Sequence, residues 1–149
     1  MATKQQRDKL KMREKAGEIR SKVVAELCAT EKTYVEGLDN LIKHFMNPLQ
    51  FKINGRQFLS AQEHSTILPS DINTIYALHS QLYIQLLKCT TNWHNDRSKI
   101  GHIFVKYGPM FKMYQNYMNN HEQAVSLLHS AQKKSYRVNP RPHPLSFVS

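Results

Sequence analysis

Residues 23–38 read VVAELCATEKTYVEGL, and their apolar side chains recur at intervals of three and four. This spacing is typical of one face of an α-helix. It continues in both directions, and the full stripe comprises Ile19, Val23, Val24, Leu27, Tyr34, Val35, Leu38, Leu41, Ile42 and Phe45. We expect Pro48 to end the helix, because proline has no backbone N–H and clashes with the preceding turn. The charged residues 4–18 can extend it backwards.

A carboxylate interrupts this apolar stripe. With Leu27 taken as zero, Glu31 falls at about +40° and Leu38 at about +20° on a helix of 3.6 residues per turn. Three explanations remain open on the residues alone. Glu31 can pair with a Lys or Arg inside the fold, lie at an end of the stripe that water reaches, or meet polar groups of another protein at a binding surface.

Further helical patterns follow. Asn54-Gly55 marks a loop over 50–59, and Ser60-Ala61-Gln62-Glu63 has the form of a capping box that starts a short helix ending near Pro69. Ser70 can cap a second long helix, whose apolar face comprises Ile72, Ile75, Tyr76, His79, Leu82, Tyr83, Leu86 and Leu87. On such a face His79 is more often a hydrogen-bonded core residue than a metal ligand.

The third long pattern begins near Ile100, after an exit loop at 92–96. We expect it to be interrupted or kinked at Gly108-Pro109, and Asn119-Asn120 can break it again. No period-2 strand of useful length is present, so the expected class is all-α, an elongated helical bundle. After Ala131 the helical stripe ends, and three closely spaced prolines indicate a disordered basic tail over 132–149. Residues 1–19 are a basic N-terminal extension, and the domain itself is expected over 20–131.

The net charge of +10 belongs to the two ends of the chain. Residues 1–22 carry eight basic and three acidic residues, and residues 132–149 carry four basic residues and no acid. The middle, 23–131, has nine basic and eight acidic residues. Binding to RNA or to a membrane surface therefore rests on the terminal charge alone, whereas DNA is not expected as a partner.

The motifs of covalent chemistry are missing from the sequence. It has no phosphate-binding glycine loop, no G-x-S-x-G and no HExxH or Cys/His zinc spacing, so we expect no catalytic residue, metal or cofactor. Cys28 has no partner in sequence that would orient it as a nucleophile. Two cysteines cannot form a disulfide framework, and no stretch approaches a membrane span, so a reduced, cytoplasmic location is expected. The residues alone indicate a helical protein-binding module.

The segment 26–38 resembles the first conserved region of Dbl-homology domains, whose pattern is E-L-x-x-T-E-x-x-Y-V-x-x-L. Segments 72–87 and 100–120 are similar to later parts of the same family, in the right order, although Tyr76 stands where the family usually has Phe. The family promotes nucleotide exchange on Rho-family GTPases without covalent chemistry. The resemblance implies that Glu31 faces the GTPase and contacts its switch I, with Thr30 beside the same surface.

The resemblance covers only the first half of the family domain. The third conserved region, with its P-x-Q-R-x-x-R-Y-type motif, is not found, and in the family that long helix packs against the first one. We therefore expect a truncated exchange factor homologue, weak or inactive alone, with much of the 19–45 stripe exposed. A splice event, a gene-model error and real biology are left open as its origin. The alternative hypothesis is a non-catalytic helical interaction module, in which a helical partner or self-association covers the stripe. A third hypothesis is a protein that contacts RNA or a membrane surface weakly through its basic ends.

Overall fold

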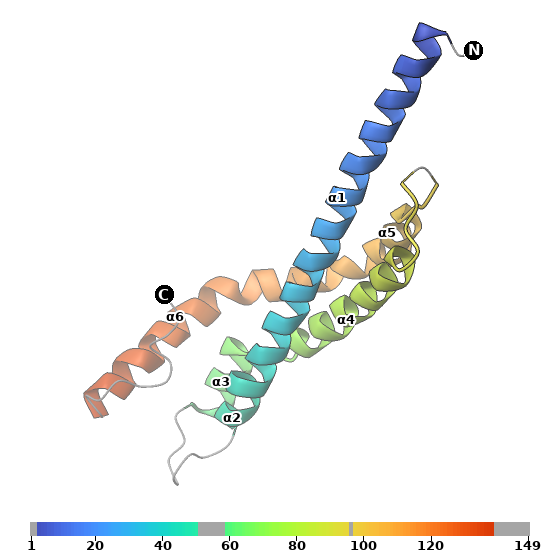
Figure 1. Ribbon diagram of the computed structural model, residues 1–149. Coiled ribbons are helices and arrows are strands. Elements are labelled where there is room, and N and C mark those ends of the chain that lie inside the picture. The colour runs from blue at the N-terminus through green and yellow to red at the C-terminus, as the bar shows by residue number, and fades with distance from the viewer. Residues whose placement is uncertain (1–2, 51–58, 96, 139–149) are drawn as a thin grey trace. The chain divides into compact units, whose positions relative to one another are not determined.

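The computed structural model describes residues 3–50, 59–95 and 97–138, and every regular element in these ranges is a helix (Figure 1). The expected all-α class is confirmed. The chain falls into two compact units, one made of Met1–Gly37 and Ala77–Phe111, the other of Leu38–Tyr76 and Lys112–Ser149. Two long helices, α1 (Lys4–Leu41) and α4 (Asp71–Thr90), each contribute to both units.

The first unit contains most of α1, the C-terminal part of α4, and α5 (Gly101–Tyr107). The α1 helix starts with a capping box that the sequence analysis missed. Thr3 Oγ1 accepts a hydrogen bond from the Gln6 N–H, and Gln6 Oε1 accepts one from the Thr3 N–H. This T-x-x-Q signal satisfies two N–H groups at the helix start. The charged residues 4–18 are therefore the first turns of α1 itself.

The buried apolar side chains of the first unit come from all three helices. They are Val24, Leu78, Leu82, Leu86, Ile103 and Tyr107. Five of the eight residues expected on one face of α4 belong to this unit's part of the helix, and the structure buries His79, Leu82 and Leu86 among them. Burial of aliphatic side chains of this size contributes about 1.5–3 kcal/mol each. The helical period in 72–87 therefore identified most of the packing face, although Leu87 is 43% exposed and the buried Leu78 was not in the expected set.

The loop after α4 packs closely on α1. Gly17 is buried, and a Cβ atom at this position would lie 3.0 Å from the Cβ of Asn95, so a glycine allows the two segments to approach. One turn further, the indole Nε1–H of Trp93 donates to Ser21 Oγ at 2.9 Å. The guanidinium of Arg20 lies 5.0 Å from the centroid of the Trp93 ring. The loop is thus fixed by polar and cation–π contacts as well as by close packing.

In the second unit, the chain continues past Leu41 without leaving the helical path. A π-helical turn, η1 (Ile42–Met46), leads into the short α2 (Asn47–Gln50), and the Asn47 N–H donates to the Ile42 carbonyl. Our expectation that Pro48 ends the helix is wrong. The wider π turn changes the hydrogen-bonding register just before the proline, where an α-helical carbonyl would meet its ring. The expected loop at 50–59 lies almost entirely outside the described residues.

The short helix α3 (Ala61–Ile67) starts with the predicted capping box at Ser60 and stops at Leu68, just before Pro69, as expected. A core cluster of this unit is formed by Met46, Leu68 and Ile72, with partly buried neighbours Leu38, Leu41, Ile42, Leu49, Ile67 and Tyr117. The buried His64 donates from Nε2 to the Met46 carbonyl at 2.9 Å. This bond ties α3 to the end of η1. The predicted helix after Ser70 begins at Asp71.

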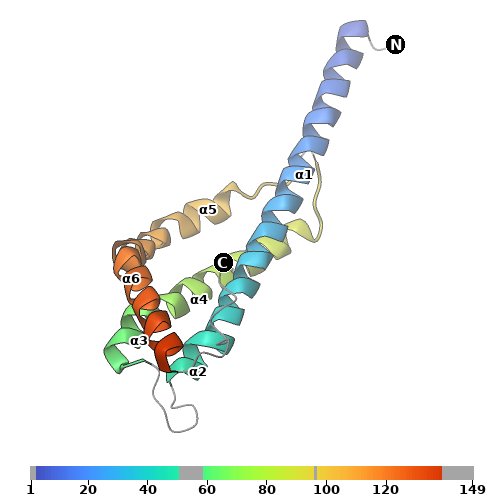
Figure 2. The same ribbon diagram turned by 90° about the vertical axis from the view of Figure 1, so that its left-hand side faces the viewer.

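The last helix is longer than expected. Gly108-Pro109 lies in a 3₁₀ stretch, η2 (Gly108–Met113), which confirms the expected interruption, but α6 (Tyr114–Val138) then runs through Asn119-Asn120 without a break. Asparagine costs a helix only about 0.7 kcal/mol relative to alanine, and packing of α6 on α3 outweighs this (Figure 2). Residues 132–138 are helical, in contrast to the disordered tail expected over 132–149; residues 139–149 lie outside the described residues.

Candidate functional site

Glu31 lies on α1 and is largely buried, with 12% of its side chain exposed. Its Oε1 is 2.6 Å from Nδ1 of His79 on α4, and the His79 side chain is 9% exposed. Of the three explanations for a carboxylate in the apolar stripe, the structure supports a partner inside the fold. That partner is a histidine, not the Lys or Arg that we expected.

Aromatic rings surround this pair. The ring of Tyr34, one turn along α1, meets the His79 ring edge-on at a centroid distance of 4.7 Å. The Phe111 ring lies 5.6 Å from the His79 ring, centroid to centroid, and is tilted by 53° to it. The prediction that His79 is a hydrogen-bonded core histidine is confirmed. A hydrogen bond among aromatic rings is electrostatically stronger than one in water, so this pair is well held.

Thr30 lies beside Glu31 in sequence but does not join the pair. It is exposed, and its Oγ1 donates to the Glu26 carbonyl at 2.8 Å. This bond within the helix uses the hydroxyl proton, and the lone pairs of the Thr30 oxygen can still accept hydrogen bonds. The structure therefore separates the two predicted binding residues into an exposed hydroxyl and a mostly buried carboxylate on the same helix.

The exposed part of the apolar stripe borders Thr30. Ile19 and Val23 are 54% and 58% exposed, and Tyr34 is 39% exposed. Val24, at the other side of the stripe, is buried. The stripe is thus split along its length into a covered half and an uncovered half, which the periodicity alone could not distinguish. An exposed apolar face rimmed by polar groups is typical of a protein-binding surface.

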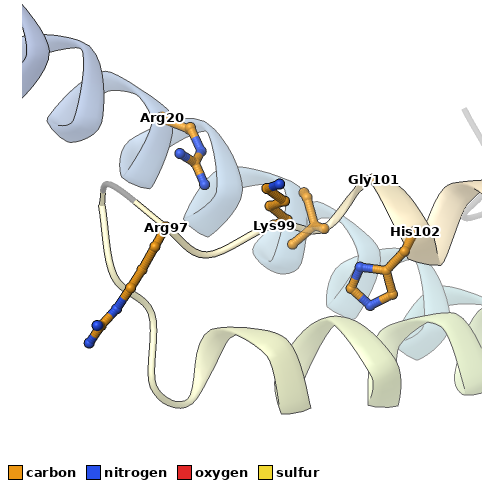
Figure 3. A pocket seen from close by; sticks show the side chains of 6 residues that line it. Arg20, Arg97, Lys99, Gly101 and His102 are labelled. Carbon is orange, nitrogen blue, oxygen red and sulfur yellow. The ribbon is translucent and has the colours of Figure 1, made fainter.

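A concavity of about 450 Å³ carries several positive charges (Figure 3). It is lined by Arg20, Arg97, Lys99, Ile100, Gly101 and His102. These groups do not converge on one point. The Arg20 guanidinium donates to the Asn95 carbonyl at 3.2 Å, and Figure 3 shows the Arg97 side chain pointing away from Arg20. Arg20 therefore has a packing role here, and the concavity does not have the geometry of an anion site.

Among the residues that the structure describes, no further cluster suggests covalent or metal chemistry. Within the residues that the structure describes, no group of three or more His, Cys, Asp or Glu side chains is placed to hold a metal ion. Both cysteines are free; Cys89 Sγ lies 3.8 Å from Nε2 of His102, and Cys28 is half-buried. None of the helices in the described ranges has the length and apolar character needed to cross a bilayer.

These features define a helical domain whose candidate site is a surface on one long helix. Residues 23–141 match the family model of the RhoGEF domain, and the chain belongs to this family. The resemblance to Dbl-homology domains is therefore confirmed. The matched range includes Thr30, Glu31 and His79.

Several curated proteins are similar to this chain. FYVE, RhoGEF and PH domain-containing protein 2 from Mus musculus is 32% identical over 114 residues, which cover 76% of this chain and 17% of that protein. Guanine exchange factor for Rac 30 from Dictyostelium discoideum is 28% identical over 109 residues, or 73% of this chain and 6% of that protein. For the human phosphatidylinositol 3,4,5-trisphosphate-dependent Rac exchanger 2 protein the identity is 28%, over 77% of this chain and 7% of that protein. The chain thus spans a small part of each relative.

Proposed function

We propose that the chain binds a Rho-family GTPase through the face of α1 that carries Thr30 and Glu31, and that it acts as a regulator of nucleotide exchange without covalent chemistry. The family match over residues 23–141, which includes the whole T-E-x-x-Y motif, carries this proposal. In the family that the sequence resembles, the glutamate of this motif contacts switch I of the GTPase. Glu31 occupies that position here.

An exchange factor works by differential binding. It accelerates nucleotide release to the extent that it stabilises the nucleotide-free GTPase more than the nucleotide-bound form. A carboxylate accepts hydrogen bonds only, so Glu31 suits the backbone N–H and hydroxyl groups of a switch segment. The exposed Val23 and Tyr34 lie on the same helix and provide apolar contact area. No bond is made or broken in the partner by any of these groups.

A binding measurement tests the role of Glu31. A nucleotide-free GTPase of the Rac type is the first choice, because two of the relatives carry Rac in their names. Glu31→Ala should weaken binding by more than about tenfold, since loss of a partly buried charged contact typically costs about 2–5 kcal/mol. The matched control is Glu36→Ala, because Glu36 is exposed and contacts only Lys32 of its own helix among the ion pairs of the described residues. Equal affinities of wild type and Glu31→Ala would contradict the proposal.

Nucleotide release is a separate question from binding. The 149-residue chain on its own should release a fluorescent guanine nucleotide from Rho-family GTPases only slightly faster than the spontaneous rate. The resemblance implies contacts to one switch only, and a partial set of contacts yields far less than a proportional share of the acceleration. Release that is robust and proportional to the concentration of monomeric chain would show that this part of the family domain suffices.

A second candidate function is that of a non-catalytic helical interaction module. The observation that favours it is the uncovered half of the α1 stripe, where Ile19 and Val23 are more than half exposed. A helical partner, or a second copy of the chain, would cover this face. Binding that depends on the nucleotide state of the GTPase favours the first function, whereas association that is insensitive to any GTPase favours the second.

A further inference from the structure

We infer that His79 is a positioning residue, which holds the Glu31 carboxylate in the orientation that contacts the GTPase. This inference rests on the proposed function and goes beyond it, because it gives a role to a residue outside the T-E-x-x-Y motif. It starts from the hydrogen bond of 2.6 Å between His79 Nδ1 and Glu31 Oε1, which links two helices within the first unit.

The direction of this bond follows from the chemistry of its partners. An ionised carboxylate only accepts hydrogen bonds, so Nδ1 of His79 is the donor and carries the proton. A carboxylate offers about four lone-pair sites, and one bond from His79 leaves the remaining sites for donors of a partner. The pair therefore resembles a metal site in which a second residue hydrogen-bonds to a metal ligand. The second residue fixes the orientation of the ligand and leaves its metal-binding atom free.

His79 is itself firmly placed. Its side chain is 9% exposed, the Tyr34 ring lies edge-on against it at 4.7 Å, and Phe111 packs on it at 5.6 Å. A free glutamate on a helix surface has three rotatable bonds, and freezing them on binding costs about 0.5–1.5 kcal/mol for such a side chain. The bond to His79 restricts Glu31 before any partner arrives. His79 thus reduces the ordering that binding requires.

His79 either acts on binding through Glu31 or only stabilises the domain. A double-mutant cycle distinguishes these two roles. His79→Phe keeps an aromatic ring but removes the donor, whereas His79→Asn places an amide N–H near the position of Nδ1. If His79 acts through Glu31, its removal matters only while Glu31 is present. If it merely stabilises the domain, His79→Phe should weaken binding to a similar extent with Glu31 or with Ala at position 31.

The experiment measures the affinity of the full chain for a nucleotide-free Rac-type GTPase, for wild type, His79→Phe, His79→Asn, Glu31→Ala and the double variant Glu31→Ala/His79→Phe. Circular dichroism first establishes that each variant is folded at the assay temperature. We expect His79→Phe to bind about five- to tenfold more weakly and His79→Asn to recover most of the loss, in the range of coupled contacts. The double variant should bind as Glu31→Ala does, within about twofold.

The outcomes separate this inference from the proposed function. A neutral Glu31→Ala overturns the assignment of Glu31 to the interface, and this inference with it. A clear loss for Glu31→Ala together with a neutral His79→Phe, or with a further loss in the double variant, overturns this inference alone. If His79→Phe does not fold, the ring ¹⁵N resonances of wild-type His79 replace it: the signature of a protonated, hydrogen-bonded Nδ1 should persist in the complex, and its loss on binding would overturn the inference.

Discussion

Ser60 and Glu63 each hydrogen-bond the backbone N–H of the other, with Ser60 Oγ 3.1 Å from the Glu63 nitrogen and Glu63 Oε2 2.9 Å from the Ser60 nitrogen. This reciprocal pair starts α3, whose His64 in turn binds the Met46 carbonyl. The pair therefore satisfies two backbone N–H donors at the helix start, which would otherwise need hydrogen bonds to water.

Ser60→Ala should therefore lower the free energy of unfolding by about 1 kcal/mol, the usual cost of losing a serine cap. Urea unfolding followed by circular dichroism measures this. Ser65→Ala is the matched control, since Ser65 lies in the same helix and its exposed hydroxyl donates only to the Gln62 carbonyl among the contacts described. Equal effects of the two substitutions would show that the capping box does not contribute.

Breaking the buried Glu31–His79 pair between α1 and α4 should affect stability as well as binding. Glu31→Ala leaves His79 Nδ1 without its acceptor in a mostly buried site, and an unmatched buried polar group costs about 1–3 kcal/mol. Glu36→Ala removes an exposed ion pair at 3.7 Å and should cost no more than about 0.5 kcal/mol. The unfolding free energies of the two variants provide the comparison; indistinguishable values would mean that water replaces Glu31 as the acceptor.

The exposed pair Asp39–Lys43 makes a prediction about pH. Lys43 Nζ lies 2.7 Å from Asp39 Oδ2, and this hydrogen bond holds the pKa of Asp39 below its ordinary 3.8 and raises the pKa of Lys43 above 10.5. The Asp39 contribution to stability is therefore complete above about pH 3.8 and is lost as the pH falls through the lower folded pKa. The Lys43 contribution is complete below pH 10.5 and is lost as the pH rises through the raised pKa.

An NMR titration of the Asp39 carboxyl carbon measures the first of these shifts. In wild type the midpoint should lie below 3.8, and in Lys43→Met it should return toward that value. Because both side chains are solvent-exposed, the accompanying change in stability should be small and should shrink further with added salt. A midpoint that Lys43→Met leaves unchanged would show that the pair does not persist in solution.

The uncovered half of the α1 stripe should drive self-association. Sedimentation velocity over a range of concentrations should detect association of the wild-type chain, and the double substitution Ile19→Gln and Val23→Gln should reduce it, because both side chains are more than half exposed on one helix face. Val105→Gln is the control, since Val105 is 79% exposed on α5. A wild-type chain that stays monomeric throughout would contradict the prediction.

Local signals in the sequence predicted much of the fold. The capping box at Ser60, the stop before Pro69 and the interruption at Gly108-Pro109 each depend on residues within one or two turns, and all were correct. The α4 face was predicted because its side chains recur at the helical period. The Thr3–Gln6 box was missed although its signal is equally local.

Features that depend on distant residues were not predictable in the same way. The helical wheels marked Glu31 and His79 as polar residues on apolar faces, but joining them across 48 residues requires the relative register of two helices. The passage through Pro48 depends on a π turn, and the continuation of α6 beyond Ala131 depends on packing that outweighs weak helix propensities. For this reason the sequence indicated that Glu31 is unusual, yet not which group pairs with it.

The docking of the α4–α5 loop on α1 gives the chain an internal optical reporter. Trp93 is the only tryptophan of the sequence, so selective excitation of indole interrogates one position. Its Nε1–H is bonded to Ser21 and its ring lies near the Arg20 guanidinium, an environment that disappears as soon as the loop leaves the helix. The wavelength and intensity of its fluorescence therefore follow the opening of this junction without any introduced label. Comparison with the loss of helical circular dichroism during unfolding establishes whether the junction opens first.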